Sequence, residues 1–330
     1  MPYTAQDPVY LSDLSPRDKR FDSHRAQVDR IIELYRASGH DGYADRMKEC
    51  SRYLDFALHF EDNGVLSPKL QCTHFCRVRL CPICQWRRSM SWQAKTLKIM
   101  PKVIEENPKS RFIFLTLTVR NCELNELRDT LKWMHNSWMK LLKRKEFAPV
   151  QGWVRSVEVT RGADDTAHPH YHVLVMVKPS YFAGSQYVSQ KRWSEVWQDC
   201  LGVGYTPVVD VRSVRPGKRE KEGEDAVLMS AAICEVLKYS VKSADSLGDD
   251  SKRRLSNQEW LSRLTSQLFK TRAVATGGIL KRHLKELEQE PEDLIHIDEE
   301  NSTPVDEEAP RLAFAWHKDK KRYQMVDEAS

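Results

Sequence analysis

Apolar side chains in the central part of the chain follow two different spacings. A two-residue spacing, which predicts strands, occurs in FIFLTLTV (112–119), WVRSVEVT (153–160), HYHVLVMV (170–177) and TPVVDVRSV (206–214). A helical spacing occurs in residues 124–145, 189–201 and 226–244. The resulting order of strand, helix, strand, strand, helix, strand, helix predicts an α+β fold with a mostly antiparallel sheet covered by helices.

The segments on either side of this sheet have other patterns. Residues 23–38 predict a helix that ends before Gly39, and residues 85–106 predict another that is basic where it begins. Residues 215–224 predict a flexible loop, and residues 288–310 predict a disordered acidic linker. We therefore expect an N-terminal helical and cysteine-rich region (1–108), the α+β domain (109–285), and an acidic linker with a C-terminal tail (286–330).

The charge distribution is uneven along the chain. The net charge is +5, yet residues 286–308 contain 11 acidic residues and neither Lys nor Arg. The rest of the chain is therefore strongly basic, which suits a polyanionic partner, although a well-solvated surface explains the charge equally well. No apolar run approaches the roughly 18 residues that span a membrane, and the N-terminus has no apolar signal region. We expect a cytoplasmic protein with no membrane partner.

A histidine-rich segment, AHPHYHVLV (167–175), predicts a metal site. His170 and His172 alternate on a strand, so they face the same side and can bind one cation together. His168 joins that face if Pro169 is accommodated at the start of the strand. Glu158, between two strand valines, is a candidate third ligand, because a carboxylate there needs a partner. Two imidazoles and one carboxylate leave coordination positions open and suit a divalent ion such as Mn²⁺ or Mg²⁺. The less favoured interpretation is a surface strand with scattered histidines.

The predicted helix 226–244 carries a candidate nucleophile. Glu235 and Tyr239 are four residues apart and share one helical face, and Lys238 and Lys242 form a second such pair. A tyrosine can attack a phosphodiester and retain the phosphate as a covalent ester, and a nearby glutamate can activate water. Taken alone, such a pair is usually an exposed carboxylate beside a packed ring. The position of this pair after the histidine strand in the same chain is what favours a catalytic role.

Cysteines are concentrated in one short segment. Of eight cysteines, Cys72, Cys76, Cys81 and Cys84 lie within thirteen residues. The spacing Cys76-x₄-Cys81-x₂-Cys84 supplies three ligands of a structural Zn²⁺ site, for which Cys50, Cys72 and His74 compete as the fourth. Free buried cysteines are the alternative. We expect three residues shortly after Cys84 to contact DNA through a stacking ring and two guanidinium groups: Trp86, Arg87 and Arg88.

Three blocks together resemble the motifs of the HUH endonucleases: FLTLTVRN (114–121), HPHYHVLV (168–175) and EVLKYSVK (235–242). They resemble most closely the plasmid rolling-circle replication initiators (Rep) that use a single tyrosine with a nearby glutamate. The resemblance extends to residues 10–25, 75–89, 155–161 and 271–281, which include the GG-containing segment TRAVATGGILK, and so covers most of residues 10–285.

The resemblance implies a role for each matching position. His170 and His172 match the metal-binding histidines, and Glu158 matches an acidic position that completes the metal site. Tyr239 matches the nicking nucleophile, and Glu235 matches the glutamate that directs water in the terminating cleavage. Cys50 matches a recurrent family position whereas Cys72 does not, so the resemblance favours Cys50 as the fourth zinc ligand.

The resemblance implies an HUH-type central antiparallel sheet with an N-terminal zinc module, and a DNA endonuclease and strand transferase. Such an enzyme nicks one strand of the plasmid double-strand origin, exposed in a hairpin or as a single strand, through a 5′-phosphotyrosine intermediate. A host helicase is an expected partner, because the sequence lacks a G-x-x-x-x-G-K-[ST] loop. A host DNA polymerase is the other expected partner, because the nick leaves a free 3′-OH that can prime synthesis. The alternatives are a related transposase or relaxase, and a zinc-dependent DNA-binding regulator that does not nick.

Overall fold

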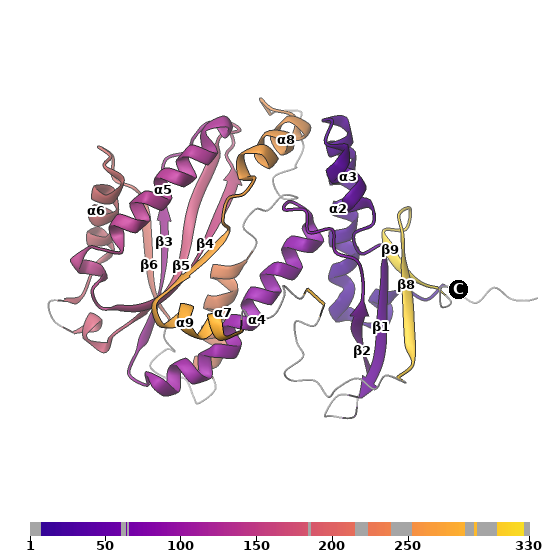
Figure 1. Ribbon diagram of the computed structural model, residues 1–330, viewed down its shortest axis with the longest axis horizontal. Coiled ribbons are helices and arrows are strands. Elements are labelled where there is room, and N and C mark those ends of the chain that lie inside the picture. Colours follow the sequence, from indigo (N-terminus) through magenta and orange to yellow (C-terminus); the bar gives the residue numbers. More distant parts are fainter. Residues whose placement is uncertain are drawn as a thin grey trace, which may run out of the picture. The chain divides into compact units, whose positions relative to one another are not determined.

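A computed structural model describes residues 8–60, 64, 66–183, 186–214, 224–238, 253–287, 294–295 and 309–326. The chain divides into two compact units (Figure 1). The first unit is formed by Met1–Ser91 together with Glu292–Ser330, and the second unit is formed by Trp92–Pro291. Each unit has its own antiparallel sheet. Among the described residues, no helix is both long and apolar enough to cross a lipid bilayer.

The second unit is built on a five-stranded sheet in the order β6-β3-β5-β4-β7. Its strands are β3 (Arg111–Thr118), β4 (Val150–Arg161), β5 (Ala167–Val177), β6 (Val209–Val214) and β7 (Val274–Gly277). Every neighbouring pair is antiparallel. The α+β fold with a mostly antiparallel sheet is therefore confirmed, and the four strands expected from the alternating pattern are all present.

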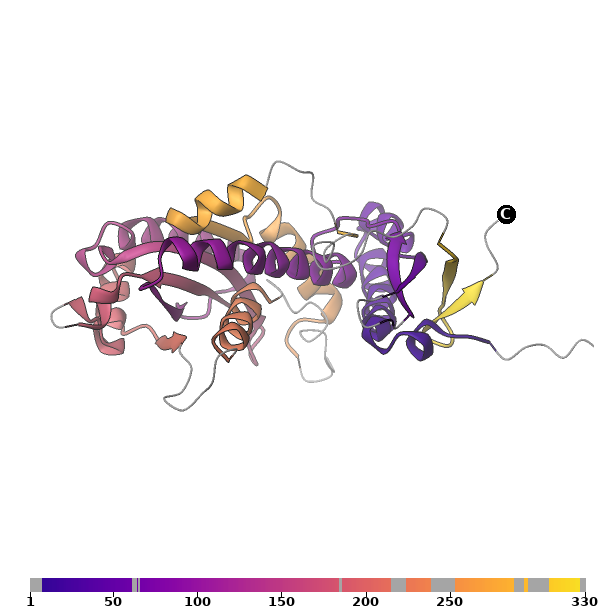
Figure 2. The ribbon, with the colours of Figure 1, turned by 90° about the horizontal axis from the view of Figure 1, so that it is seen from below.

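Helices cover both faces of this sheet (Figures 1 and 2). On one face, α4 (Pro82–Glu106) from Trp92 onward, α7 (Glu224–Leu237) and α9 (Gly278–Leu287) pack on an apolar core that includes Phe112, Leu174 and Met176. On the other face lie α5 (Leu127–Leu141) and α6 (Gln190–Leu201), and α8 (Asn257–Leu268) packs against α5. The alternation of side chains along β5 explains the two layers, because Tyr171 contacts Trp138 and Trp197 while Leu174 faces α7.

The first unit combines helices with a four-stranded sheet in the order β2-β1-β8-β9. Its elements are α1 (Leu11–Leu14), the 3₁₀ turn η1 (Pro16–Asp18), α2 (Lys19–Ala37), α3 (Asp41–Lys48), β1 (Tyr53–Phe60), β2 (Leu66–Cys72), β8 (Arg311–His317) and β9 (Arg322–Val326). The C-terminal hairpin β8-β9 pairs with β1, more than 250 residues away in sequence. Phe56 and Phe314 form the centre of this sheet, with their rings 5.9 Å apart.

Two glycines allow β7 and α9 to approach β4 closely. Gly278 has φ +61°, and a Cβ atom there would meet the carbonyl oxygen of Gln151. A Cβ atom on Gly277 would meet the indole ring of Trp153. The GG segment therefore has a packing role, since it brings the start of α9 onto the edge of the strand that carries Glu158.

Candidate functional site

Glu158, His170 and His172 converge on one point of the second unit. The register of β4 and β5 places Glu158 opposite His170, and Ser156 opposite His172. The Nε2 atom of His172 lies 2.8 Å from Oε2 of Glu158, and Nε2 of His170 lies 3.3 Å from the same oxygen. These three ligand atoms form one of the two groups of described residues that could hold a metal ion.

The second ring nitrogen of each histidine is also engaged. Nδ1 of His170 lies 3.3 Å from the backbone carbonyl of His168, and Nδ1 of His172 lies 3.3 Å from Oγ1 of Thr116. A histidine that donates its Nδ1–H to a carbonyl presents the lone pair of Nε2 to a cation. The contact with the strand backbone therefore holds the His170 ring with its Nε2 atom, the nitrogen that could bind a metal, toward Glu158.

The donor set fits a divalent ion in an open octahedral site. Adjacent ligands about 2.1 Å from such an ion lie about 3 Å apart, close to the 2.8 and 3.3 Å separations of the three atoms. Burial would raise the pKa of the Glu158 carboxyl, but hydrogen bonds from His170 and His172 and their charge hold that pKa well below its ordinary value. The lowered pKa favours the ionised carboxylate of Glu158. A cation bound between Glu158 and the two imidazoles would take the place of the Nε2 protons that now face the carboxylate.

His168 lies outside this group. Its ring centroid is 5.2 Å from that of His170, but its Nδ1 atom is 2.8 Å from Oδ1 of Asn121. Burial lowers the pKa of His168, and the neighbouring His170 lowers it further. The structure thus pairs His168 with the asparagine that ends the FLTLTVRN block and leaves the three converging ligands as Glu158, His170 and His172.

The helix α7 packs on the sheet face that carries the histidines. Ile233 and Leu237 are buried against the sheet, and the Ser156 hydroxyl donates a hydrogen bond to the backbone carbonyl of Val236. Glu235 is half exposed on this helix, where Nζ of Lys238 lies 2.5 Å from its Oε1. Tyr239 and Lys242 lie outside the described residues, and Tyr239 directly follows Lys238 in sequence.

Sequence reasoning overlooked Ser156 and Asn121. Ser156 is buried in β4, where it links the strand beside His172 to α7. The available signal was the alternation in WVRSVEVT, which places Ser156 on the same strand face as Val154 and Glu158, where a buried hydroxyl needs a partner. Asn121 lies in a block that was recognised only for its overall pattern.

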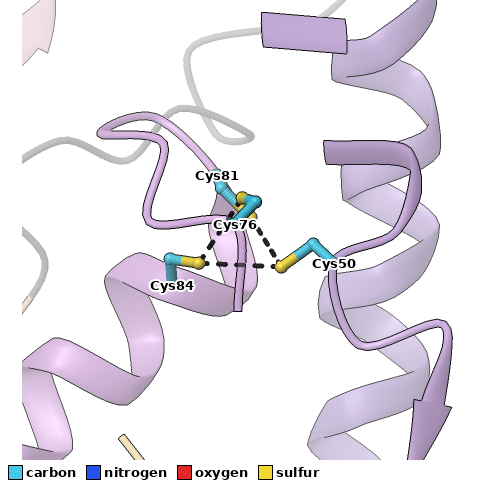
Figure 3. A group of neighbouring side chains, drawn as sticks. All are labelled: Cys50, Cys76, Cys81 and Cys84. Atoms are coloured by element: carbon cyan, nitrogen blue, oxygen red, sulfur yellow. Dashed lines mark hydrogen bonds between the residues drawn. The ribbon is translucent and has the colours of Figure 1, made fainter. Parts of the chain in front are cut away.

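Four cysteines form the second candidate metal group, in the first unit (Figure 3). The Sγ atom of Cys50 lies 3.6 Å from those of Cys81 and Cys84, and the Sγ atoms of Cys76 and Cys84 are also 3.6 Å apart. All four are buried, and none forms a disulfide. Cys50 follows α3, whereas Cys84 lies in the first turn of α4, so the group joins segments separated by more than 30 residues.

The geometry of the group fits a tetrahedral Zn²⁺ site. Four thiolates about 2.3 Å from zinc would lie about 3.8 Å apart, near the observed 3.6 Å. The backbone amide of Arg77 donates to Sγ of Cys84 at 3.3 Å, which favours a thiolate. Burial raises the pKa of Cys81 well above its ordinary value, so a cation is needed to hold it as thiolate. Cys72 and His74, the competing candidates, are exposed and outside the group.

The expectation that Trp86 and Arg87 contact DNA is not supported by the structure. Trp86 is only 4% exposed, with its ring stacked on His24 and edge-on to Phe21. The guanidinium group of Arg87 donates to the carbonyls of Leu294 and Ile295 at 2.7 and 2.8 Å. The amphipathic pattern of α4 directs both inward, which residue type alone does not reveal. Arg88 is half-buried and donates to the Arg77 carbonyl at 3.1 Å.

Fold and geometry define an α+β protein with two separate groups of side chains that could each hold a metal ion. A family model described as "Replication protein" matches residues 67–324. The chain is 38% identical over 316 residues to "Protein rep" of Lactiplantibacillus plantarum, which covers 93% of this chain and 94% of the relative. It is 36% identical over 284 residues to "Protein rep" of Lentilactobacillus hilgardii, and the matched residues cover 85% of this chain and 87% of the relative. No solved structure matches.

A third relative, "Protein rep" of Streptococcus pneumoniae, is 32% identical over 315 residues, which cover 93% of this chain and 92% of the relative. The family-model match extends over parts of both units and includes Glu158, His170 and His172 together with Cys76, Cys81 and Cys84, whereas Cys50 precedes it. The chain belongs to the replication protein family of plasmid rolling-circle initiators, as the three sequence blocks had indicated.

Proposed function

We propose that this replication initiator nicks one strand of its plasmid origin with Tyr239 and remains attached to the new 5′ end. The observation that carries the proposal is the convergence of Glu158, His170 and His172 on one point of the sheet. Buried histidine and carboxylate ligands with an open side are the arrangement expected for a metal that acts on a phosphate.

The second unit would orient the scissile phosphate at this point. A divalent ion such as Mn²⁺ or Mg²⁺, held by His170, His172 and Glu158, would supply positive charge next to a non-bridging phosphate oxygen. The hydrogen bonds at the Nδ1 atoms keep both imidazole rings in place, so the ligand positions are fixed before DNA binds.

Tyr239 is the proposed nucleophile because it follows α7, which Ser156 fastens beside His172. Its phenolate oxygen would attack phosphorus and displace the 3′ oxygen, which takes a proton and leaves as a free 3′-OH. The product is a 5′-phosphotyrosine ester that conserves the bond for later transfer. Lys238 and Lys242 would stabilise the phenolate and contact the strand.

Glu235 is the proposed general base for termination. Its carboxylate is half exposed, lies four residues before Tyr239 in sequence and forms an ion pair with Lys238. After one round of replication, Glu235 would accept a proton from water, whose oxygen attacks the phosphorus and releases the protein. The free 3′-OH made in the first step would prime a host polymerase, and a host helicase would open the duplex.

The cysteine group is proposed as a structural zinc site held by Cys50, Cys76, Cys81 and Cys84. Four thiolates leave no open position for a substrate, so the ion would stabilise the fold rather than react. It would fix the end of α3 to the beginning of α4 inside the first unit.

A nicking assay tests the proposal. Labelled single-stranded oligonucleotides covering the origin are incubated with protein and Mn²⁺ or Mg²⁺ and separated on a denaturing gel. We expect cleavage with a protein-linked 5′ fragment, which disappears with EDTA, in Tyr239→Phe and in His172→Ala. Binding without cleavage under every metal condition, on supercoiled plasmid as well, would favour a zinc-dependent DNA-binding regulator instead.

A further inference from the structure

The first unit contains a hollow of about 1240 Å³ that neither metal group uses. It is bordered by the first turns of α2, by β1 and β2, by the start of α4 and by the turn between β8 and β9. Seven of its lining residues are Lys or Arg, and three are Asp. We name this hollow the basic groove. Six of its cations lie around its rim: Arg17, Lys19, Arg20, Lys69, Lys321 and Arg322.

The three carboxylates of the groove are already occupied. Asp13 pairs with Arg322, Asp18 accepts a hydrogen bond of 2.6 Å from Ser15, and Asp22 accepts the backbone amide of Tyr323 at 2.8 Å. By contrast, Lys19, Arg20 and Lys321 are exposed and form no ion pair with any residue in the described parts of the chain. The groove therefore has an excess of positive charge directed at solvent.

The free cations come from two segments that are distant in sequence. Lys19 and Arg20 begin α2, whereas Lys321 lies in the turn of the C-terminal hairpin. Pairing of β8 with β1 brings that turn to the groove, and the amide of Tyr323 fixes it to Asp22 of α2. The C-terminal hairpin thus adds Lys321 and Arg322 to the cations of α2 around the groove.

We propose that the basic groove binds the sugar–phosphate backbone of duplex DNA, as a site separate from the Glu158–His170–His172 group. Both aromatic rings among the described lining residues, Phe21 and Trp86, are buried, at 1% and 4% exposure. Single-strand sites stack bases on exposed aromatic rings, whereas duplex backbone contacts require only cations and polar groups. The groove exposes cations and polar groups but not the rings of Phe21 and Trp86, which is the composition of a duplex backbone contact. The inference rests on the proposed function only in that the duplex would be plasmid origin DNA.

The test is a triple variant, Lys19→Ala, Arg20→Ala and Lys321→Ala, in the full-length protein. The matched control removes three exposed cations outside the groove: Arg36→Ala, Lys48→Ala and Arg52→Ala. Fluorescence anisotropy measures binding of a short random-sequence duplex and of an oligo-dT strand across a salt series. Thermal unfolding shows whether each variant is folded.

We expect the groove variant to bind the duplex about tenfold or more weakly near physiological salt, and the slope of log K against log salt to fall by about 2 to 3. The control variant and oligo-dT binding should stay near wild type. Equal weakening by both triple variants, an unchanged slope, or a larger loss for oligo-dT than for the duplex would overturn the inference.

The groove and the nuclease site are tested independently. The groove variant should still nick a single-stranded oligonucleotide at the wild-type rate with Mn²⁺, because no residue of the groove belongs to the Glu158 group. If wild type does not nick at all, the proposed function fails while the duplex-binding result still stands. If nicking and duplex binding fall together in a folded groove variant, the separation of the two sites is wrong.

Discussion

The hydroxyl of Ser156 donates a hydrogen bond to the backbone carbonyl of Val236. Ser156 lies opposite His172 in the neighbouring strand, and Val236 is three residues before Tyr239. One hydrogen bond thus links the strand pair that carries the metal ligands to the last turn of the helix that leads into the proposed nucleophile.

Ser156→Ala should slow nicking while the protein stays folded. Loss of the hydroxyl removes one buried hydrogen bond, at a cost of about 0.5–1.5 kcal/mol in unfolding free energy. Because the helix end is then free to shift, we expect kcat to fall about tenfold or more with little change in KM for DNA. Ser137→Ala is the matched control, since Ser137 is also fully buried and donates to a carbonyl, that of Trp133. Equal kcat losses in both variants would remove the positioning role.

Zinc content should depend on Cys50 and not on Cys72. Cys50→Ala removes one of four converging thiols, so we expect loss of the bound zinc and a marked fall in Tm. Cys72→Ala changes an exposed thiol in β2 and should leave both unchanged. Elemental analysis of purified protein and thermal unfolding provide the measurements. A protein that retains stoichiometric zinc without Cys50 would show that another residue completes the site.

Gly278→Ala should destabilise the second unit. The added methyl group meets the carbonyl of Gln151, and φ of +61° is unfavourable for alanine, so we expect a loss of about 2 kcal/mol or more in unfolding free energy. Gly42→Ala in α3 is the control, because its Cβ meets nothing within 4 Å, and the substitution should stabilise the helix by about 0.5–1 kcal/mol. Chemical denaturation distinguishes the two, and a neutral Gly278→Ala would contradict the close approach of α9 to β4.

Asp165 should give the protein acid-sensitive stability. This carboxylate, in the turn between β4 and β5, is fully buried. Burial would raise its pKa, but hydrogen bonds from the Leu255 amide and from Arg161 lower that pKa below its ordinary value. A lowered folded-state pKa contributes stability above the unfolded pKa of about 3.9, and this contribution is lost as the pH falls further.

Asp165→Asn should therefore be less stable than wild type at neutral pH, with a difference that shrinks below about pH 4. Asparagine tolerates the positive φ of 63° at this position, so backbone strain does not confound the comparison. Denaturation curves across the pH range measure the difference. A difference that stays constant from neutral to acid pH would rule out this titration.

The local patterns in the sequence predicted the second unit well, because its strands and helices are long and periodic. Alternation along HPHYHVLV was enough to place His170 and His172 on one face, and the strand register then brought Glu158 to them. The hairpin of residues 311–326 was not predicted, although Leu312, Phe314 and Trp316 alternate. Its partner, β1, lies at the other end of the chain, and pairing over that separation leaves no local signal.

Besides the long-range pairing of strands, the sequence did not reveal which side chains are buried. Trp86 and Arg87 have the residue types of a DNA contact, but the amphipathic face of α4 turns Trp86 into the core and ties Arg87 to carbonyls at 294 and 295. The cations of the basic groove went unnoticed for the opposite reason. Lys19 and Lys321 are ordinary surface residues in sequence, and only the β1–β8 pairing brings them to one rim.

The central claim, that Tyr239 forms a covalent ester with the 5′ phosphate at the nick, is tested most directly by mapping the attachment site. Wild-type protein is allowed to cleave an origin oligonucleotide with Mn²⁺, the adduct is digested with nuclease and protease, and the modified peptide is sequenced by mass spectrometry. We predict a nucleotide on the phenolic oxygen of Tyr239 in the peptide that contains it, and no adduct in Tyr239→Phe or with EDTA. Cleavage without any adduct, or an adduct on a different residue, would contradict the account.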